Sequence, residues 1–183
     1  MMLAEAPAVV IGVGNILRGD DGAGVRAVEA LRAAWARDPM ALPVDTRLVD
    51  GGTLGLDLLR TVAEARALVL LDAVDLQLPA GTVRVLRGDD IVAAGGGWGG
   101  AADGGVGELL AIARLMGWLP DRVSLVGIQV DAVGFGIGLS EPVEAALPLA
   151  VETARHELRV LGGLTVPGGP DDPRPGARKG ATA

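Results

Sequence analysis

The chain has 183 residues, half of them hydrophobic, with a formal net charge of −7 and no cysteine. This length fits a single domain with a sizeable buried core. The negative charge argues against a nucleic-acid-binding protein, and the lack of cysteine excludes disulfides, thiolate metal sites and a cysteine nucleophile.

The first half of the chain predicts three strands, each followed by a polar or glycine-rich turn. Residues 7–12 form an apolar run typical of a buried parallel strand, and this run leads into Gly12-Val-Gly-Asn-Ile-Leu-Arg-Gly-Asp-Asp-Gly-Ala-Gly24. The next helix is predicted to bury Val25, Val28, Leu31 and Trp35. A strand over 44–49 ends in Asp50-Gly-Gly-Thr-Leu-Gly55, and the helix after it has Leu56, Leu59 and Val62 at helical spacing. A third strand, 67–71, runs into Asp72-Ala-Val-Asp75.

The second half predicts an antiparallel edge strand over 81–86, a long glycine-rich loop over 88–105 and a helix over 106–118 that buries Leu109, Leu110, Ala113 and Leu115. A last central strand spans 123–130. The final helix starts at Ser140-Glu-Pro and runs to about Leu161, with a bend at Pro148. Residues 163–183 are rich in glycine and proline and are expected to form a disordered tail outside a domain of residues 1–162. Together these elements predict a single-domain α/β fold: a twisted, mostly parallel sheet of about five strands with helices on both faces.

No apolar run approaches the roughly 20 residues that a membrane span needs. Residues 1–6 include Glu5 and do not show the pattern of a secretory signal. We therefore expect a cytoplasmic protein that binds neither membrane nor nucleic acid.

Carboxylates follow each of the first three predicted strands. They are Asp20 and Asp21, then Asp50, then Asp72 and Asp75. In open parallel sheets, ligands bind beyond the carboxyl ends of the strands, so adjacent strands would bring these acids to one edge. Acids gathered there raise one another's pKa unless a cation compensates, which favours a metal site.

Each acid also has an ordinary structural interpretation. Asp20 or Asp21 could cap a helix, and Asp50 could close a turn. Asp72 is harder to explain in this way, because it directly follows a buried apolar run. A dinucleotide site is a weaker alternative: Leu17 stands where the third glycine of Gly-x-Gly-x-x-Gly belongs, and two aspartates occupy the place of the pyrophosphate.

These motifs together resemble the nickel–iron hydrogenase maturation endopeptidases over about residues 8–160. The resemblance rests on Gly12-Val-Gly-Asn-Ile-Leu, Asp20-Asp-Gly-x-Gly-Val25, Asp50-Gly-Gly-Thr-x-Gly55, Leu71-Asp-Ala73, Leu125-Val-Gly-Ile-Gln129 and Gly138-Leu-Ser140. Such proteins remove a C-terminal extension from the hydrogenase large-subunit precursor after nickel insertion, an activity classed as aspartyl-type endopeptidase.

The resemblance implies roles for particular residues. Asp21 and Asp72 correspond to the two catalytic carboxylates that contact the metal, which is expected to be the nickel of the precursor. Asp50, Gly51, Gly52 and Thr53 would line the groove for the substrate's C-terminal segment. The single asparagine, Asn15, is suited to hydrogen-bonding substrate backbone and equally to stabilising the turn. We expect a monomer.

The family's metal-contacting histidine has no counterpart here. An ungapped match places Ala102 at its position, with Asp103 alongside as a candidate third oxygen ligand. A carboxylate in place of imidazole favours harder cations than nickel. The only histidine, His156, is expected on the surface of the last helix. The missing histidine keeps open an alternative function, a non-catalytic protein that docks a hydrogenase subunit without cleaving it.

Overall fold

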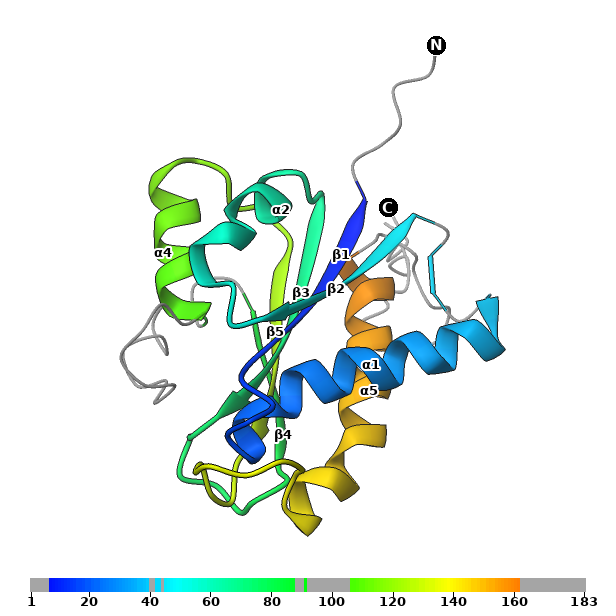
Figure 1. Cartoon of the computed structure of the whole chain (residues 1–183). Coiled ribbons are helices and arrows are strands. Elements are labelled where there is room, and N and C mark those ends of the chain that lie inside the picture. The colour runs from blue at the N-terminus through cyan, green and yellow to red at the C-terminus, as the bar shows by residue number, and fades with distance from the viewer. Residues whose placement is uncertain (1–6, 40–41, 44, 88–90, 92–105, 162–183) are drawn as a thin grey trace, which may run out of the picture.

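The computed structural model describes residues 7–39, 42–43, 45–87, 91 and 106–161. A five-stranded sheet with strand order β2-β1-β3-β5-β4 forms its centre (Figure 1). The strands are β1 (Ala8–Val13), β2 (Thr46–Gly52), β3 (Ala67–Val74), β4 (Val83–Arg87) and β5 (Val123–Gln129). β2, β1, β3 and β5 run parallel, and β4 pairs antiparallel with β5 at the edge. The predicted α/β fold is confirmed.

Helices cover both faces of this sheet. The α-helices are α1 (Ala23–Arg37), α2 (Leu59–Ala63), α4 (Val106–Leu115) and α5 (Glu141–Leu161), and two 3-10 turns, η1 (Asp20–Gly22) and η3 (Gly55–Leu58), precede α1 and α2. α1 and α5 lie on one side of the sheet, with α2 and α4 on the other (Figure 1). None of the described helices is long and apolar enough to cross a bilayer.

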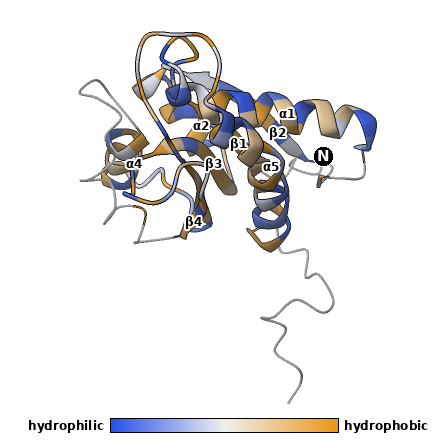
Figure 2. Cartoon of the chain, turned by 90° about the horizontal axis from the view of Figure 1, so that it is seen from below, coloured by the Kyte–Doolittle hydropathy of each residue, from blue (hydrophilic) through white to orange (hydrophobic). Residues whose placement is uncertain are grey.

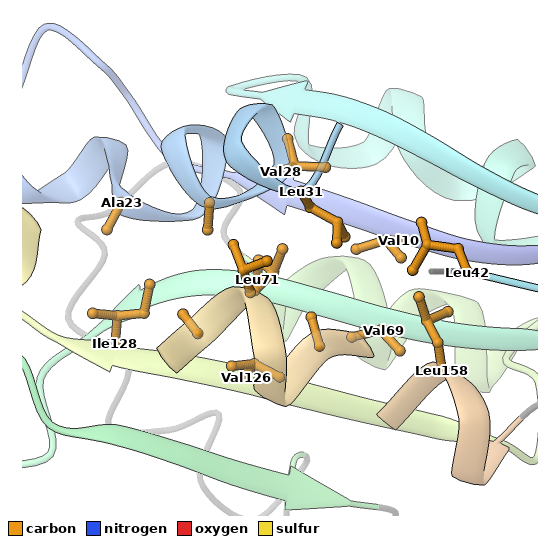
Figure 3. Close-up of a cluster of buried hydrophobic side chains, with 14 of the residues drawn as sticks. Val10, Ala23, Val28, Leu31, Leu42, Val69, Leu71, Val126, Ile128 and Leu158 are labelled. Atoms are coloured by element: carbon orange, nitrogen blue, oxygen red, sulfur yellow. The ribbon is translucent and has the colours of Figure 1, made fainter. Parts of the chain in front are cut away.

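The core consists of two layers, because successive residues of each strand point to opposite faces. Val10, Val69, Leu71, Val126 and Ile128 pack against α1 and α5, as Figure 3 shows with Leu31 and Leu158. Val9, Ile11, Leu68, Leu70 and Leu125 pack against residues of α2 and α4. Strands buried on both faces need apolar residues at every position, and this explains the uninterrupted apolar runs of the sequence. The helices are amphipathic, and Figure 2 shows α1 and α5 with both orange and blue stretches.

Several predicted boundaries and faces are wrong. β2 and β3 extend beyond their predicted ends, so Asp50 and Asp72 lie inside strands. η3 changes the phase of the chain before α2, so that Leu58 is buried and Leu56 is exposed. α4 ends at Leu115, before the predicted residue 118, and Leu115 is 87% exposed because it lies off the face of Leu109 and Ala113. The predicted loop 88–105, except Ile91, and the predicted tail 163–183 lie outside the described residues.

Candidate active site

The three parallel strands β2, β1 and β3 are neighbours in the sheet. The predicted acids can meet at one edge only if these strands are adjacent. α1 packs closely onto the carboxyl ends of β1 and β3: a Cβ on Gly24 would lie 2.2 Å from the Leu71 carbonyl oxygen and 2.4 Å from that of Val13. The turn before α1, which contains Asp20 and Asp21, therefore lies directly against the strand that contains Asp72. The packing of this one glycine determines how close the two elements come.

Asp72 is a partly buried carboxylate inside β3, in register with Gly127 of β5. Strand alternation places it on the same face as Leu70 and Val74, which belong to the apolar layer under α2 and α4. Desolvation by this surrounding protein raises the pKa of Asp72 well above its usual range. The N–H of Ala73 partly opposes the shift, and the negative charge of Asp21 adds to it. Asp72 therefore holds its proton far more tightly than an ordinary aspartate.

Asp21 is the second member of this pair. It stands in η1, and its Oδ2 accepts a hydrogen bond of 3.1 Å from the Asn15 N–H. This bond directs the Asp21 side chain back toward the start of the turn that follows β1. Because its charge raises the pKa of Asp72, the two side chains are close enough to interact electrostatically. The structure thus brings together the two residues expected to be catalytic.

Asp20 has a different environment, although it is adjacent in sequence. Its carboxylate is 1% exposed and accepts four hydrogen bonds from the loop between β5 and α5: from the N–H groups of Asp131, Ala132 and Ser140, and from the Ser140 hydroxyl. Burial alone would raise the pKa of Asp20, but these bonds outweigh it and lower the pKa below the usual value. Asp20 is therefore an ionised anchor for a distant loop. It is not a helix cap, because Gly22 is the N-cap of α1.

The residues expected to bind substrate lie at the end of β2 and in the turn after β1, and hydrogen bonds connect the two segments. The Asp50 side chain is exposed and accepts a hydrogen bond of 3.0 Å from the Gly52 N–H, and the Gly52 carbonyl accepts one of 2.9 Å from the Gly14 N–H. Asn15 Oδ1 accepts a 2.9 Å bond from the Leu17 N–H. Gly51 is buried and Thr53 is exposed beside this turn. The turn-stabilising roles of Asn15 and Asp50 are confirmed, and contact with a substrate remains a prediction.

The described residues contain no group of three His, Cys, Asp or Glu side chains arranged to hold a metal ion. Asp103, the candidate third ligand, and Ala102 lie outside the described residues. Asp75 does not join the pair, because it is exposed and bonds to the side chains of Gln77 and Gln129. Two carboxylates whose repulsion disfavours full ionisation nevertheless fit a cation, whose charge would compensate them.

The buried glutamine at the end of β5 was not predicted to have a role. Gln129 is 3% exposed, and its Oε1 accepts hydrogen bonds from the N–H groups of Leu76 (2.7 Å) and Leu78 (3.3 Å). Gln129 therefore fixes the chain directly after β3, the strand that contains Asp72. The sequence contains a pattern that indicates such a role, because a polar glutamine ends the apolar run Leu125-Val-Gly-Ile-Gln129. His156 is exposed on α5, as expected.

The glycines of the first turn pack against protein. Gly14 has a φ of +124°, and a Cβ there would lie 1.8 Å from the Asp21 carbonyl oxygen; at Gly12 it would lie 2.3 Å from the Gly24 carbonyl oxygen. The chain's own backbone thus fills the space in which a dinucleotide pyrophosphate would approach these glycines. This geometry argues against the dinucleotide alternative.

Comparisons with known proteins agree with this arrangement. Residues 25–157 match the family model described as hydrogenase maturation protease. The hydrogenase expression/formation protein HupD of Rhodobacter capsulatus is 39% identical over 156 residues, covering 84% of this chain and 72% of that protein. The hydrogenase 2 maturation protease of Escherichia coli K12 is 34% identical over 160 residues, covering 87% of this chain and 94% of that protein.

The fold has equally clear counterparts among solved structures. The hydrogenase maturating endopeptidase HybD from Escherichia coli superposes with a TM-score of 0.74 at 32% identity, over 85% of this chain and 94% of that one. The [NiFe] hydrogenase maturation protease HybD from Thermococcus kodakarensis, at 23% identity and a TM-score of 0.63, shares the fold. Nothing in these comparisons supports a non-catalytic docking protein.

Proposed function

Because the chain belongs to the hydrogenase maturation protease family, we propose that it is the endopeptidase that removes the C-terminal extension of a nickel-loaded hydrogenase large-subunit precursor. Asp21 and Asp72 are the carboxylates that contact the nickel of the precursor. In this assignment nickel is part of the substrate and is not a resident cofactor. Asn15 and Asp50–Thr53 line the path of the substrate's C-terminal segment.

The observation that supports the proposal is the electrostatic coupling of Asp21 with Asp72. Ionising both acids is costly while no cation is present, because desolvation and the charge of Asp21 both raise the pKa of Asp72. A divalent cation from the substrate removes this cost and displaces the Asp72 proton. The pair therefore favours a precursor that carries a divalent cation over an empty one.

The residues around the pair keep it ready for this encounter. The Asn15 N–H orients the Asp21 carboxylate before the substrate arrives. Asp72 needs no such turn, because β3 pairs with β1 as far as Leu71 and with β5 at Asp72 itself, and this pairing fixes its position. If the two acids held the nickel of the precursor, the metal would polarise the scissile carbonyl or lower the pKa of an attacking water, and Asp72 would be placed to receive and return a proton.

Cleavage by purified variants tests the assignment. Wild-type protein should cleave nickel-loaded precursor, whereas Asp72→Asn and Asp21→Asn should each reduce cleavage at least a hundredfold while remaining folded. Asp121→Asn, a change at an exposed acid before β5, is the matched control and should cleave normally. Undiminished cleavage by Asp72→Asn would refute the catalytic assignment.

A binding measurement addresses the role of nickel separately. Titration of Ni²⁺ into the wild type, repeated over a range of pH, should release protons wherever Asp72 is still protonated, since Asp72 must ionise to bind the ion. The same titration with Asp72→Asn should show weaker binding and no proton release. Equal heats in both proteins would remove Asp72 from the metal contact even if it is needed for cleavage.

A further inference from the structure

The loop between β5 and α5 carries an apolar surface that no described residue covers. In residues 131–138 every position is exposed, and Phe135 is 101% exposed, Ile137 82% and Val133 42%. Gly134, Gly136 and Gly138 alternate with them, and a Cβ at any of these glycines would meet nothing within 4 Å. No polar side chain between them therefore shields the apolar ones. We refer to residues 131–139 as the 131–139 loop.

This loop is joined to the turn that contains Asp21. Gly136 accepts a hydrogen bond from the Gly19 N–H (2.9 Å) and donates one to the Leu17 carbonyl (3.1 Å). Asp20 binds both ends of the loop, at Asp131 and at Ser140. Leu17, across this small bridge, is 56% exposed. The apolar surface therefore lies next to the turn that contains Asp21.

Charge around the loop is mostly negative. Asp131 and Glu141 are exposed near its two ends, and Asp75 is exposed and bonded to Gln129, which lies just before the loop. Arg18, whose backbone bridges to Gly136, carries the opposite charge. A partner that covers Phe135 and Ile137 would bring its flanking residues next to these acids. Complementarity therefore favours apolar side chains accompanied by basic ones.

We propose that the 131–139 loop is a docking surface for an apolar, net-basic segment of the precursor polypeptide, separate from the part that reaches Asp21 and Asp72. This inference rests on the proposed function, since a peptidase must contact its protein substrate at the edge where its catalytic groups lie. Phe135 and Ile137 anchor the segment, because large apolar side chains that become fully desolvated dominate binding. The hydrogen bonds through Asp20 keep this anchor at a fixed place relative to Asp21.

The test separates docking from cleavage. The double variant Phe135→Ser/Ile137→Ser should raise KM for full-length precursor at least about tenfold, the loss expected for two anchors, with kcat unchanged at saturating precursor. Leu115→Ser is the matched control, because Leu115 is as exposed but lies at the end of α4, and it should leave KM unchanged. Raising the salt concentration should weaken precursor binding to the wild type.

Binding in a background that cannot cleave makes the outcomes distinct. In Asp72→Asn protein, precursor affinity should fall at least about tenfold when Phe135 and Ile137 are both replaced by serine. Unchanged affinity would overturn the docking proposal while leaving the proposed function intact. Failure of the wild type to cleave, with affinity still dependent on the two residues, would overturn the function instead. A dimer in the wild type that the double variant loses, with precursor affinity unaltered, would assign the surface to a second copy of the chain and overturn the proposal.

Discussion

Asp20 and Ser140 are 120 residues apart in the chain, yet the Ser140 N–H lies 2.6 Å from Asp20 Oδ1 and the Ser140 hydroxyl 2.8 Å from Oδ2. The same carboxylate binds the N–H groups of Asp131 and Ala132. One buried side chain thus connects the turn after β1, the start of the 131–139 loop and the residue before α5. This connection determines how the first and last parts of the fold meet beside the candidate active site.

Removing this carboxylate should destabilise the protein. Asp20→Ala removes a buried carboxylate that accepts four hydrogen bonds, so we expect the free energy of unfolding to fall by about 2–4 kcal/mol. Urea denaturation followed by circular dichroism measures the change. Asp50→Ala, which removes an exposed aspartate bonded to a nearby N–H, should cost about 1 kcal/mol or less. Equal losses in the two variants would contradict the anchoring role of Asp20.

Asp72 should lower stability at neutral pH, although catalysis requires it. Its folded-state pKa is raised, so its charge penalty is absent below the unfolded-state pKa of about 4 and grows as the pH rises toward the folded-state value. Asp72→Asn should therefore raise the free energy of unfolding by about 1 kcal/mol or more at pH 7.5. It should have little effect near pH 4. Denaturant midpoints over this pH range give the comparison.

Asp20 provides a contrast of opposite sign. Its folded-state pKa is lowered, so the stability it contributes is complete above the unfolded-state pKa of about 4 and is lost as the pH falls through the folded-state pKa. The stability gap between wild type and Asp20→Asn should thus narrow in acid, whereas the gain from Asp72→Asn appears only on the alkaline side. If stability changed with pH in the same direction in both variants, the pKa shift assigned to Asp20 or to Asp72 would be wrong.

The contact between α1 and the sheet should tolerate no side chain at Gly24. A methyl group there meets the carbonyl oxygens of Leu71 and Val13, both backbone atoms that cannot move aside cheaply. We expect Gly24→Ala to cost about 2 kcal/mol or more and to reduce cleavage, because the separation of η1 from β3 must increase. Gly134→Ala, where a Cβ meets nothing within 4 Å, should change the thermal midpoint little.

A buried charge on α5 depends on its partner from the edge strand. Glu157 is 1% exposed and accepts hydrogen bonds from Arg87 of β4, one of them 2.8 Å from Arg87 Nε to Glu157 Oε2. Arg87→Ala would leave this carboxylate without that partner, at a cost of about 3 kcal/mol. Arg60→Ala breaks only a surface pair with Glu64 and should leave the denaturation midpoint unchanged. Equal denaturation midpoints for Arg87→Ala and Arg60→Ala would show that other groups stabilise the charge of Glu157.

The sequence predicts the α/β fold well, because parallel strands buried on both faces read as continuous apolar runs and glycines mark the turns between them. It predicts boundaries less well where a polar residue stands inside a strand. Asp72 looks like the end of β3, but pairing with β5 carries the strand on to Val74. Local spacing also misplaces Leu56 and Leu115, since the 3-10 turn and the early end of α4 depend on tertiary packing.

The sequence predicts that Asp20 holds the turn and that Asp21 faces the cleft that Asp72 also lines. Adjacent strands ending near aspartates indicate that Asp21 and Asp72 meet, and the resemblance selects the same two residues. The hydrogen bonds of Asp20 agree with that role, but its partners lie more than a hundred residues away, so no local pattern predicts which loop it holds. The hydrogen bonds of Gln129 to the loop after β3 are likewise long-range.

The two acids of the site differ in how freely they can adjust. Asp72 stands in a strand that pairs with β1 as far as Leu71 and with β5 at Asp72 itself, whereas Asp21 stands in a short turn fastened through its neighbour Asp20 to the 131–139 loop. Any change in the separation of the acids must therefore come from the turn, and the turn must take the loop with it. A precursor bound to that loop thus fixes the position of Asp21, while β3 fixes the position of Asp72. Correct binding of the substrate and correct spacing of the two acids therefore depend on each other.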